Sequence, residues 1–490
     1  MSAHVRPVGR PLNPNVAPAA EAGLCRPLFA RAAEHAARFR ERIGERPPRP
    51  TITPPELEAL FDGPTPEVGA EPLAVIDALE AAADPGLAGS VGPRFFGWVV
   101  GASHPVGVAA DMLASAWGQN AHSYRGSPAA AMAEKVAARW LLDVLQLPSE
   151  CSVGFATGAT MASFVCLAAA RHAVLARVGW DVEADGLAGA PRVRLFVGAD
   201  AHTTIFAALR YLGFGERVSR IATDREGRMD AKALAAALAQ GCGPAIVIAQ
   251  AGQIHTGAFD PFTEIVRLCR AHGAWLHVDG AFGLWARTDP ELMPLTQGLE
   301  DADSWSTDGH KWLQVPYDSG FAIVRDAQAH RRAMAITASY LPRAGEDEYD
   351  PGALVPELSR RARGFATWAQ LRALGRSGIA RLVRNHCALA QRLAARLAAE
   401  PGIAVVNDVC LNQVIVRFGH GGEDQEALTR ATIERLQADD ICLAGGADFH
   451  GRHVLRISVI AGPLTEADID RLAVAVKSAW RHVAASARGG

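Results

Sequence analysis

Short apolar runs alternate with longer helical stretches through the middle of this 490-residue chain. The apolar runs, which have the length of strands, lie at 193–198, 218–222, 245–251, 275–278, 303–306 and 321–324. Helical stretches at 161–178, 231–239 and 262–272 stand between several of them. This alternation is typical of a mostly parallel sheet covered by helices, and it predicts an α/β fold.

The pattern differs before residue 92. A proline-rich leader at 1–20 precedes a helical stretch at 27–43, and a second helix is expected at 72–82 after a proline break at 46–55. Such an arm cannot bury its apolar side alone, so we expect it to pack on a partner subunit. Packing on its own chain is the alternative.

The pattern changes again after residue 350. Two helices, two strand-like runs and a final helix are expected there, at 363–386, 387–399, 414–418, 454–459 and from Thr465 onward. This order predicts a smaller α+β domain. We therefore expect an N-terminal leader and helical arm, a large domain and a small C-terminal domain, at residues 1–92, 93–350 and 351–490.

Composition narrows the functional classes. The 49 lysines and arginines nearly balance the 52 aspartates and glutamates, and no basic run indicates nucleic-acid binding. Eight cysteines are scattered without a Cys-x-x-Cys pair, so we expect reduced thiols and a cytoplasmic protein, without a metal site. The N-terminus lacks the apolar segment of a secretory signal, and no later run is expected to span a membrane.

Lys311 and Asp279 carry the strongest chemical signal. Each follows an apolar run, and about 30 residues separate them, roughly one strand-helix-strand unit. A desolvated lysine amine can condense with an aldehyde, and a carboxylate at a strand end can keep a pyridine nitrogen protonated. Most lysines are simply solvated, and an aspartate here could cap a helix instead. Together the two residues predict a pyridoxal 5'-phosphate (PLP) site.

A phosphate cup is expected at the start of the helix near residue 161. The residues that form it are Thr157, Gly158, Ala159 and Thr160. Backbone amides at a helix N-terminus, together with two hydroxyls, suit a phosphate, although ordinary capping is the alternative. His310 is a second candidate phosphate ligand.

Two further strand ends carry candidate ring contacts. His202 could stack on the pyridine ring opposite Ala281, although a histidine in such a place is more often a polar loop residue. Gln253 or His255 could contact the ring substituent or the surroundings of the lysine. Simple turn structure is the alternative for this second pair.

These residues together resemble the group II PLP-dependent amino acid decarboxylases of fold type I, which include aromatic-L-amino-acid, glutamate and histidine decarboxylases. The resemblance covers residues 93–458 and includes His310-Lys311-Trp312, the upstream His-Val-Asp and His-Thr-Thr elements, and Pro93-Arg94-Phe95-Phe96-Gly97-Trp98. It implies a seven-stranded sheet, a small α+β domain and a homodimer with the active site at the interface. It also implies that Lys311 forms the Schiff base, Asp279 pairs with the ring nitrogen and His202 stacks on the ring.

The chain departs from the family pattern at several places. Asp308-Gly309 stands where the family usually has Asn-Pro, which puts a carboxylate beside the phosphate, and Gly158-Ala159 replaces Gly-Gly. The family's mobile loop carries a tyrosine that protonates the substrate carbon, but here the corresponding stretch offers only Tyr340 and Tyr349. Without that donor, oxygen could intercept the carbanion and give an aldehyde.

The sequence gives weaker evidence for the substrate than for the cofactor. Apolar residues fall where the resemblance places the side-chain pocket, namely Phe95, Phe96, Trp98, Val99 and Val100. They favour an aromatic or other hydrophobic L-amino acid unless they belong to the core, whereas Arg125 could pair with an acidic substrate. The predicted reaction is decarboxylation to an amine and carbon dioxide. An oxidative aldehyde synthase, a carbon-carbon lyase and a non-catalytic PLP-binding dimer are the alternatives.

Overall fold

The computed structural model describes residues 18–336, 349–462 and 464–489. The chain divides into two compact units, Met1–Gly89 and Ser90–Gly490. The first unit contains α1 (Pro18–Glu41), α2 (Pro54–Phe61) and α3 (Pro72–Ala83). Asp77 of α3 binds Arg31 at 3.2 Å and His35 at 2.8 Å, which joins α3 to α1. The domain boundaries expected at residues 92 and 350 stay predictions.

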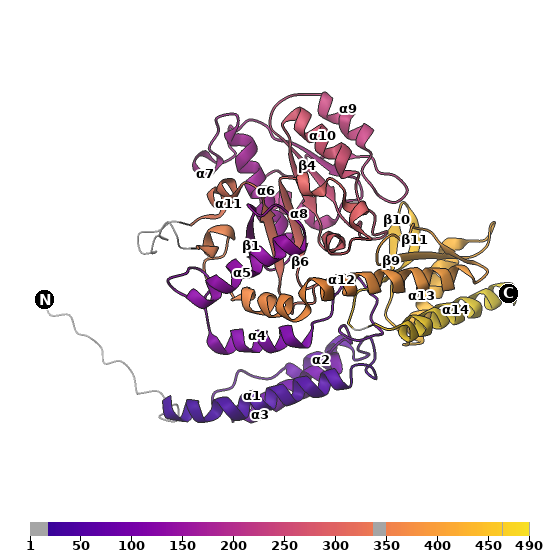
Figure 1. Ribbon diagram of the computed structural model, residues 1–490. Helices are drawn as coiled ribbons and strands as arrows, with labels where there is room; N and C mark the ends of the chain where they lie inside the picture. Colours follow the sequence, from indigo (N-terminus) through magenta and orange to yellow (C-terminus); the bar gives the residue numbers. More distant parts are fainter. Residues whose placement is uncertain (1–17, 337–348, 463, 490) are drawn as a thin grey trace. The chain divides into compact units, whose positions relative to one another are not determined.

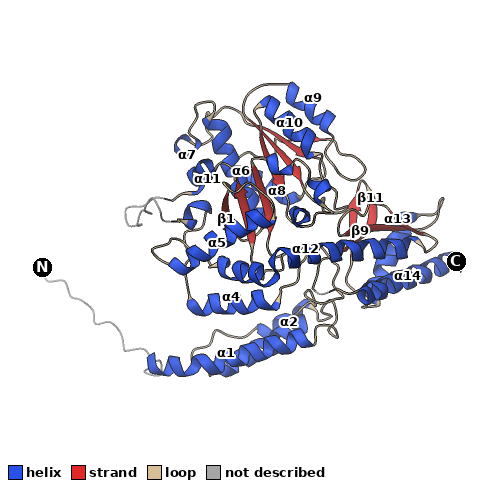
Figure 2. Ribbon diagram, viewed as in Figure 1, coloured by secondary structure: helices blue, strands red, loops and turns tan. Residues whose placement is uncertain are grey.

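A seven-stranded sheet forms the centre of the second unit (Figures 1 and 2). Its strands, in spatial order, are β1 (Ser152–Ala156), β7 (Gly320–Val324), β6 (Ser304–Asp308), β5 (Trp275–Asp279), β4 (Ala245–Gln250), β2 (Arg194–Gly198) and β3 (Ser219–Ile221). Strand β7 is antiparallel to both neighbours, and the other pairs are parallel. The expected α/β fold with a mostly parallel sheet is confirmed.

Alternate residues of β4 show how both faces of the sheet are covered. Val247 and Ala249 join one apolar cluster with residues of α5 and α10, whereas Ile246 and Ile248 join another with α6 and α8. Because both faces are buried, the strand is apolar throughout rather than alternating. The helices of this part are α4 (Pro105–Trp117), α5 (Pro128–Val144), α6 (Ala159–Ala176), α7 (Val182–Asp185), α8 (Thr203–Tyr211), α9 (Ala231–Ala239), α10 (Phe262–His272) and α11 (Ala327–Met334).

Helix α6 is both long and apolar. By length and composition it could cross a membrane, contrary to the expectation that no run would be long enough, but 67% of it is buried in the protein. It packs against β6, β7, α8 and α11. Because the helix is covered on several sides, its apolar composition is typical of a helix in the core of a large α/β protein.

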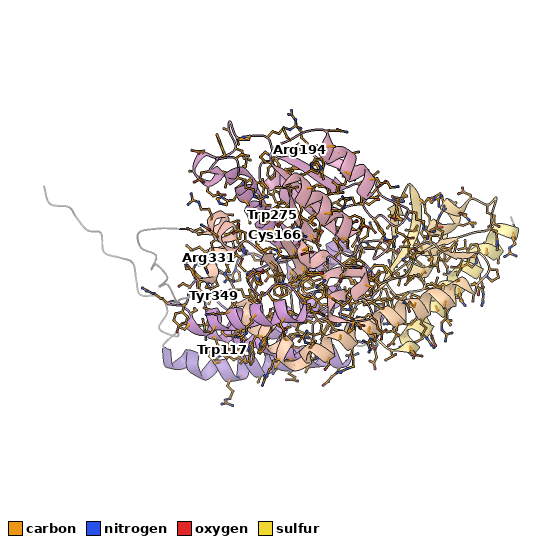
Figure 3. All side chains as sticks on the ribbon, turned by 45° about the horizontal axis from the view of Figure 1, so that its top comes forward. Trp117, Cys166, Arg194, Trp275, Arg331 and Tyr349 are labelled. Atoms are coloured by element: carbon orange, nitrogen blue, oxygen red, sulfur yellow. The ribbon has the colours of Figure 1, made fainter. Side chains whose placement is uncertain are left out.

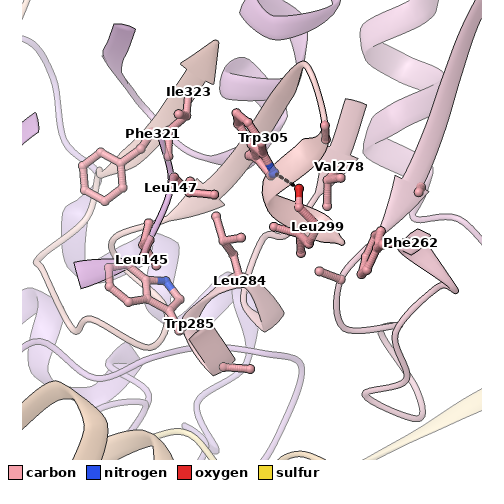
Figure 4. Packing of buried hydrophobic residues seen from close by; sticks show 14 of the residues in the cluster. Leu145, Leu147, Phe262, Val278, Leu284, Trp285, Leu299, Trp305, Phe321 and Ile323 are labelled. Carbon is pink, nitrogen blue, oxygen red and sulfur yellow. Dashed lines mark hydrogen bonds between the residues drawn. The ribbon is translucent and has the colours of Figure 1, made fainter. Parts of the chain in front are cut away.

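Large aromatic side chains fill the core beneath the carboxyl ends of the strands. The indole of Trp305 donates a 2.9 Å hydrogen bond to the carbonyl of Leu299 (Figure 4), and the indole of Trp285 donates to the carbonyl of Asp308 at 3.0 Å. Because a buried indole N–H needs an acceptor, the first bond holds the start of β6 against the preceding turn and the second holds its end. Short 3-10 helices lie at Asp84–Gly86, Gly283–Thr288, Met293–Thr296, Leu299–Asp301 and Pro351–Leu354.

The C-terminal part has its own antiparallel sheet. Its elements are α12 (Arg363–Ala398), β8 (Ile403–Val405), β9 (Gln413–Phe418), α13 (Gln425–Ala438), β10 (Gly445–Phe449), β11 (Arg452–Ser458) and α14 (Glu466–Gly489), and the strand order is β10-β11-β9-β8. The predicted helix boundary between His386 and Cys387 is wrong, because α12 continues through it and is interrupted at Gly375 instead. The positive φ of 61° at Gly375 is a conformation that glycine adopts without steric cost.

Candidate functional site

A cavity of about 310 Å³ lies at the carboxyl ends of the central strands. The loops after β1, β4, β5 and β6 contribute to it, as does the start of α8. Every residue predicted to hold the cofactor lines this cavity: Thr157, Gly158, Ala159, Thr160, His202, Asp279, Ala281, Asp308, His310 and Lys311. The sheet therefore brings together residues that are up to about 150 positions apart in the sequence, because parallel strands share one carboxyl edge.

Lys311 and Asp308 form an ion pair at one end of the cavity. The Lys311 Nζ lies 3.0 Å from Oδ2 of Asp308, whose side chain is only 3% exposed. The other carboxylate oxygen, Oδ1, accepts a 2.5 Å hydrogen bond from the backbone amide of Ala159 at the start of α6. The lysine is thus held by a charge at its strand end rather than by an apolar surrounding.

Asp279 ends β5, beside β6 in the sheet. Its carboxylate accepts one hydrogen bond, from the Ala281 amide at 3.2 Å, and forms no ion pair among the described residues. Burial raises the pKa of Asp279, while the positive charges of His202 and Lys311 oppose that rise. A buried carboxylate with so few partners is suited to a cationic ligand atom.

Two histidines stand at the cavity with different surroundings. Burial lowers the pKa of His202, whose Nδ1 lies 2.7 Å from Oγ1 of Thr204 at the start of α8. Burial also lowers the pKa of His310, and its ring packs on Tyr317 with 4.3 Å between ring centres. Nδ1 of His310 accepts from the Ser319 amide at 3.2 Å, which leaves Nε2 to face Asp308 at 3.4 Å.

Comparison with known proteins identifies the family of this chain. Residues 54–418 match the pyridoxal-dependent decarboxylase conserved domain. The chain belongs to this decarboxylase family. It is 30% identical over 334 residues to an aromatic-L-amino-acid decarboxylase of Bacillus atrophaeus, covering 66% of this chain and 67% of that protein. It is 26% identical over 445 residues to a 4-hydroxyphenylacetaldehyde synthase of Rhodiola rosea, covering 87% and 89%.

Solved structures agree on the fold of the decarboxylase. The Oryza sativa TDC crystallised with PLP and tryptamine superposes with a TM-score of 0.87 at 24% identity, covering 97% of this chain and 99% of that one. The apo form of mouse CSAD gives a TM-score of 0.85 at 22% identity, covering 94% and 99%. These likenesses extend over nearly the whole chain, and they show that the fold-type-I architecture is correct.

The decarboxylase depends on PLP, and its cavity fits that cofactor. When bound, PLP supplies an aldehyde that bonds to amines and a protonated ring that withdraws electrons from the substrate. Asp279 would pair with the ring nitrogen, and the amides at the start of α6 would hold the phosphate. Lys311 is the lysine in the cavity, and the described lining contains no other lysine. The individual contacts stay predictions.

The residues predicted for the substrate pocket do not line the cavity. Phe96 is buried in the core of the C-terminal part, and Val99 is buried in the apolar cluster that contains Val247 and Ala249 of β4. Trp98, with a φ of 51°, is 63% exposed, and Arg125 is also exposed. Phe96, Trp98, Val99 and Arg125 are not among the residues that line this cavity, and their assignment to a substrate pocket stays a prediction. The segment still passes close by, since a Cβ at Gly101 would lie 1.9 Å from the carbonyl oxygen of Lys311.

Gln253 and His255 belong to a turn rather than to the cavity lining. The side-chain oxygen of Gln253 accepts from the amides of His255 at 2.6 Å and Thr256 at 3.0 Å. The His255 ring packs on Phe449 of β10, with 5.1 Å between ring centres. The turn alternative is therefore the better description of both residues, and Ile254 between them is the one that faces the cavity.

Sequence reasoning missed several lining residues. They are Thr204, Gln250, Gly252, Ile254 and Phe282. It also missed Arg456 of β11, whose guanidinium donates to the carbonyl of Ile254 at 3.3 Å and forms no ion pair among the described residues. Because Ile254 lines the cavity, this contact brings Arg456 beside it. Burial lowers the pKa values of both His202 and His255, and the charge of Arg456 lowers them further. A single arginine inside the apolar run 454–459 was the signal that could have found it.

Of the two candidate loop tyrosines, only Tyr349 lies among the described residues. Tyr349 (labelled in Figure 3) does not line the cavity, and its hydroxyl has no hydrogen-bond partner among the described residues. Burial raises the pKa of its phenol, and the charge of the nearby Glu134 raises it further. Tyr340 lies outside the described residues.

Proposed function

We propose that this decarboxylase converts a hydrophobic, most favourably aromatic, L-amino acid to an amine and carbon dioxide. The observation that supports the proposal is the charge distribution of the cavity. Among its described lining residues the only side chains able to carry a positive charge are Lys311 and the two histidines, all assigned to the cofactor, so none is left to pair with an acidic substrate side chain. Ile254 and Phe282 supply apolar surface instead. Relatives named aromatic-L-amino-acid decarboxylases support the same substrate class.

We also infer that Arg456 holds the substrate's carboxylate. Its guanidinium is partly buried beside the cavity, and burial lowers its pKa, which an incoming carboxylate would counteract. A guanidinium can hold a carboxylate with two parallel hydrogen bonds and fix its direction. Fixing that direction matters because the bond that breaks must lie perpendicular to the cofactor ring.

A second candidate outcome is oxidative release of an aldehyde. The amino acid would react with oxygen and water to give the aldehyde, carbon dioxide, ammonia and hydrogen peroxide. The burial of Tyr349 removes one of two candidate proton donors, and a relative of Rhodiola rosea is named an aldehyde synthase. We favour the amine because Tyr340 is still a candidate donor.

We also propose a homodimer in the cytoplasm. Helix α4 carries four exposed apolar side chains, Val106, Met112, Leu113 and Trp117, which a second copy of the chain would cover. Free thiols at Cys151, Cys166, Cys242, Cys269, Cys387, Cys410 and Cys442 suit a reducing compartment. Sedimentation at several protein concentrations would test the dimer, and a monomer at all of them would contradict it.

The substrate proposal is tested by incubating the PLP-loaded enzyme with the twenty amino acids and common aromatic derivatives. Carbon dioxide, amine, aldehyde and hydrogen peroxide are measured together, with Lys311→Ala as the inactive control. Equal carbon dioxide and amine from aromatic substrates would support the proposal. Aldehyde with peroxide would select the oxidative enzyme, and faster turnover of glutamate or aspartate would contradict the substrate class. Cleavage without carbon dioxide would indicate a carbon-carbon lyase, and PLP binding without any turnover would indicate a non-catalytic dimer.

A further inference from the structure

A carboxylate of the protein itself, that of Asp308, is hydrogen-bonded to the start of helix α6. Oδ1 of Asp308 accepts the Ala159 amide at 2.5 Å and lies 3.4 Å from Nε2 of His310. Its other oxygen lies 3.0 Å from the ammonium group of Lys311. The carboxylate of Asp308 therefore interacts with an amide, an imidazole and an ammonium group, and the residues that carry them all line the cavity.

The carboxylate is held tightly against the phosphate cup. A Cβ added at Gly158 would lie 3.2 Å from Oδ1 of Asp308 and 3.0 Å from the ring of His310, so little space separates the loop from these side chains. The backbone of Asp308 is fixed as well, because its amide donates to the carbonyl of Ala281 at 2.9 Å and its carbonyl accepts from Trp285. These two bonds hold the main chain of Asp308 in place at the end of β6.

A phosphate brought to the start of α6 needs the same donors. Amides at a helix N-terminus and nearby cations are what stabilise a phosphate, and here Asp308 engages one of those amides and two of those side chains. Two anions that share donors in a water-poor site repel each other much more strongly than in water. The side chain of Asp308 is 3% exposed, so water screens this repulsion poorly.

We propose that Asp308 competes with the phosphate group of the cofactor for these donors. It keeps the phosphate cup ordered, but it weakens the binding of the cofactor. Asparagine has the same shape, keeps an oxygen for the Ala159 amide and removes the negative charge. The inference concerns the cofactor alone and does not depend on which amino acid is the substrate.

The test measures equilibrium binding of PLP and of pyridoxal, which lacks the phosphate, to the full-length apoprotein. Asp308→Asn is expected to bind PLP about tenfold more tightly than the unchanged protein, and pyridoxal with unchanged affinity. Asp143→Asn is the matched control, because Asp143 is an exposed carboxylate of α5 and its replacement changes the net charge equally. Cofactor absorbance and protein fluorescence give the binding curves, so the readout does not depend on turnover.

Two outcomes would overturn the proposal. In the first, Asp308→Asn binds PLP with equal or lower affinity. In the second, it gains the same factor for pyridoxal as for PLP, which would place the effect at Lys311 or the ring rather than at the phosphate. Thermal unfolding of each variant checks folding, and Asp308→Ala, which also removes the charge, carries the same two comparisons if the asparagine variant does not fold.

Discussion

The indole nitrogen of Trp312 donates a 3.1 Å hydrogen bond to Nδ1 of His386. Trp312 directly follows Lys311, and His386 lies on α12, so this bond ties the segment of Lys311 to the long helix. Nε2 of the same imidazole faces the carbonyl of Gly462 at 3.3 Å, which requires the proton on Nε2. The ring is therefore neutral and bridges two segments that flank the site.

Replacing His386 by leucine is expected to lower the free energy of unfolding by about 1–3 kcal/mol, because the Trp312 indole N–H would be buried without an acceptor. His386→Asn keeps an oxygen near the position of Nδ1 and should lose less. Urea unfolding gives both values. Equal losses in the leucine and asparagine variants would show that packing, rather than the hydrogen bond, is what His386 provides.

Acid is expected to destabilise the protein through its buried histidines. Burial lowers the pKa of His330 and His386 to about 4 and that of His277 to about 3. Their unfolded value is about 6.5, so the unfolded chain binds more protons and stability falls as pH drops from about 6.5 toward 4. Each histidine contributes a slope of about 1.4 kcal/mol per pH unit in that window.

Unfolding free energies between pH 7.5 and 4.5 check this expectation. His386→Asn cannot take up the proton and should show a shallower decline than the unchanged protein. An identical decline in the two proteins would show that His386 does not contribute to the loss of stability at low pH.

Lys311→Ala is expected to abolish covalent attachment of the cofactor and to reduce turnover by at least about a thousandfold. Borohydride treatment followed by digestion and mass spectrometry locates the attachment. Lys232→Ala is the matched control, since Lys232 is exposed on α9 and should be without effect. Cofactor mass on any other lysine of the unchanged protein would contradict the assignment.

Asp279→Asn is expected to bind PLP but to lose turnover by roughly a thousandfold, because a neutral amide cannot keep the ring nitrogen protonated. The measurement is kcat with saturating cofactor, together with the cofactor's dissociation constant. Near-normal kcat would show that Asp279 does not serve the ring's electron-withdrawing role.

The ion pair of Glu134 and Arg360 is expected to matter for folding. The two side chains are each 1% exposed and share hydrogen bonds of 2.7 and 2.8 Å. Glu134→Ala should cost about 3–5 kcal/mol, because it leaves a buried guanidinium uncompensated. The exposed pair of Asp143 and Arg376 is the control, and Asp143→Ala should cost under about 1 kcal/mol. Similar losses at the two sites would contradict the argument from burial.

Much of the large domain could be predicted because its signals are local. Buried parallel strands are apolar throughout, so runs such as 245–251 and 275–278 are visible without any partner. The boundary inside α12 was misplaced because Gly375 interrupts the helix without ending the helical pattern. The strands β8 and β10 were not anticipated, since their short and partly polar sequences become strands only by pairing with β9 and β11.

The sequence by itself determined the chemistry of the site, because Lys311, Asp279 and the loop 157–160 carry functional groups at strand ends that a parallel sheet must gather at one edge. Only the tertiary structure decided which neighbours those groups meet. It placed Phe96 in the core and Arg456 against the carbonyl of Ile254, and it brought Asp308 onto both Lys311 and the start of α6. Such contacts depend on packing between distant segments, whose geometry the local pattern of apolar and polar residues does not contain.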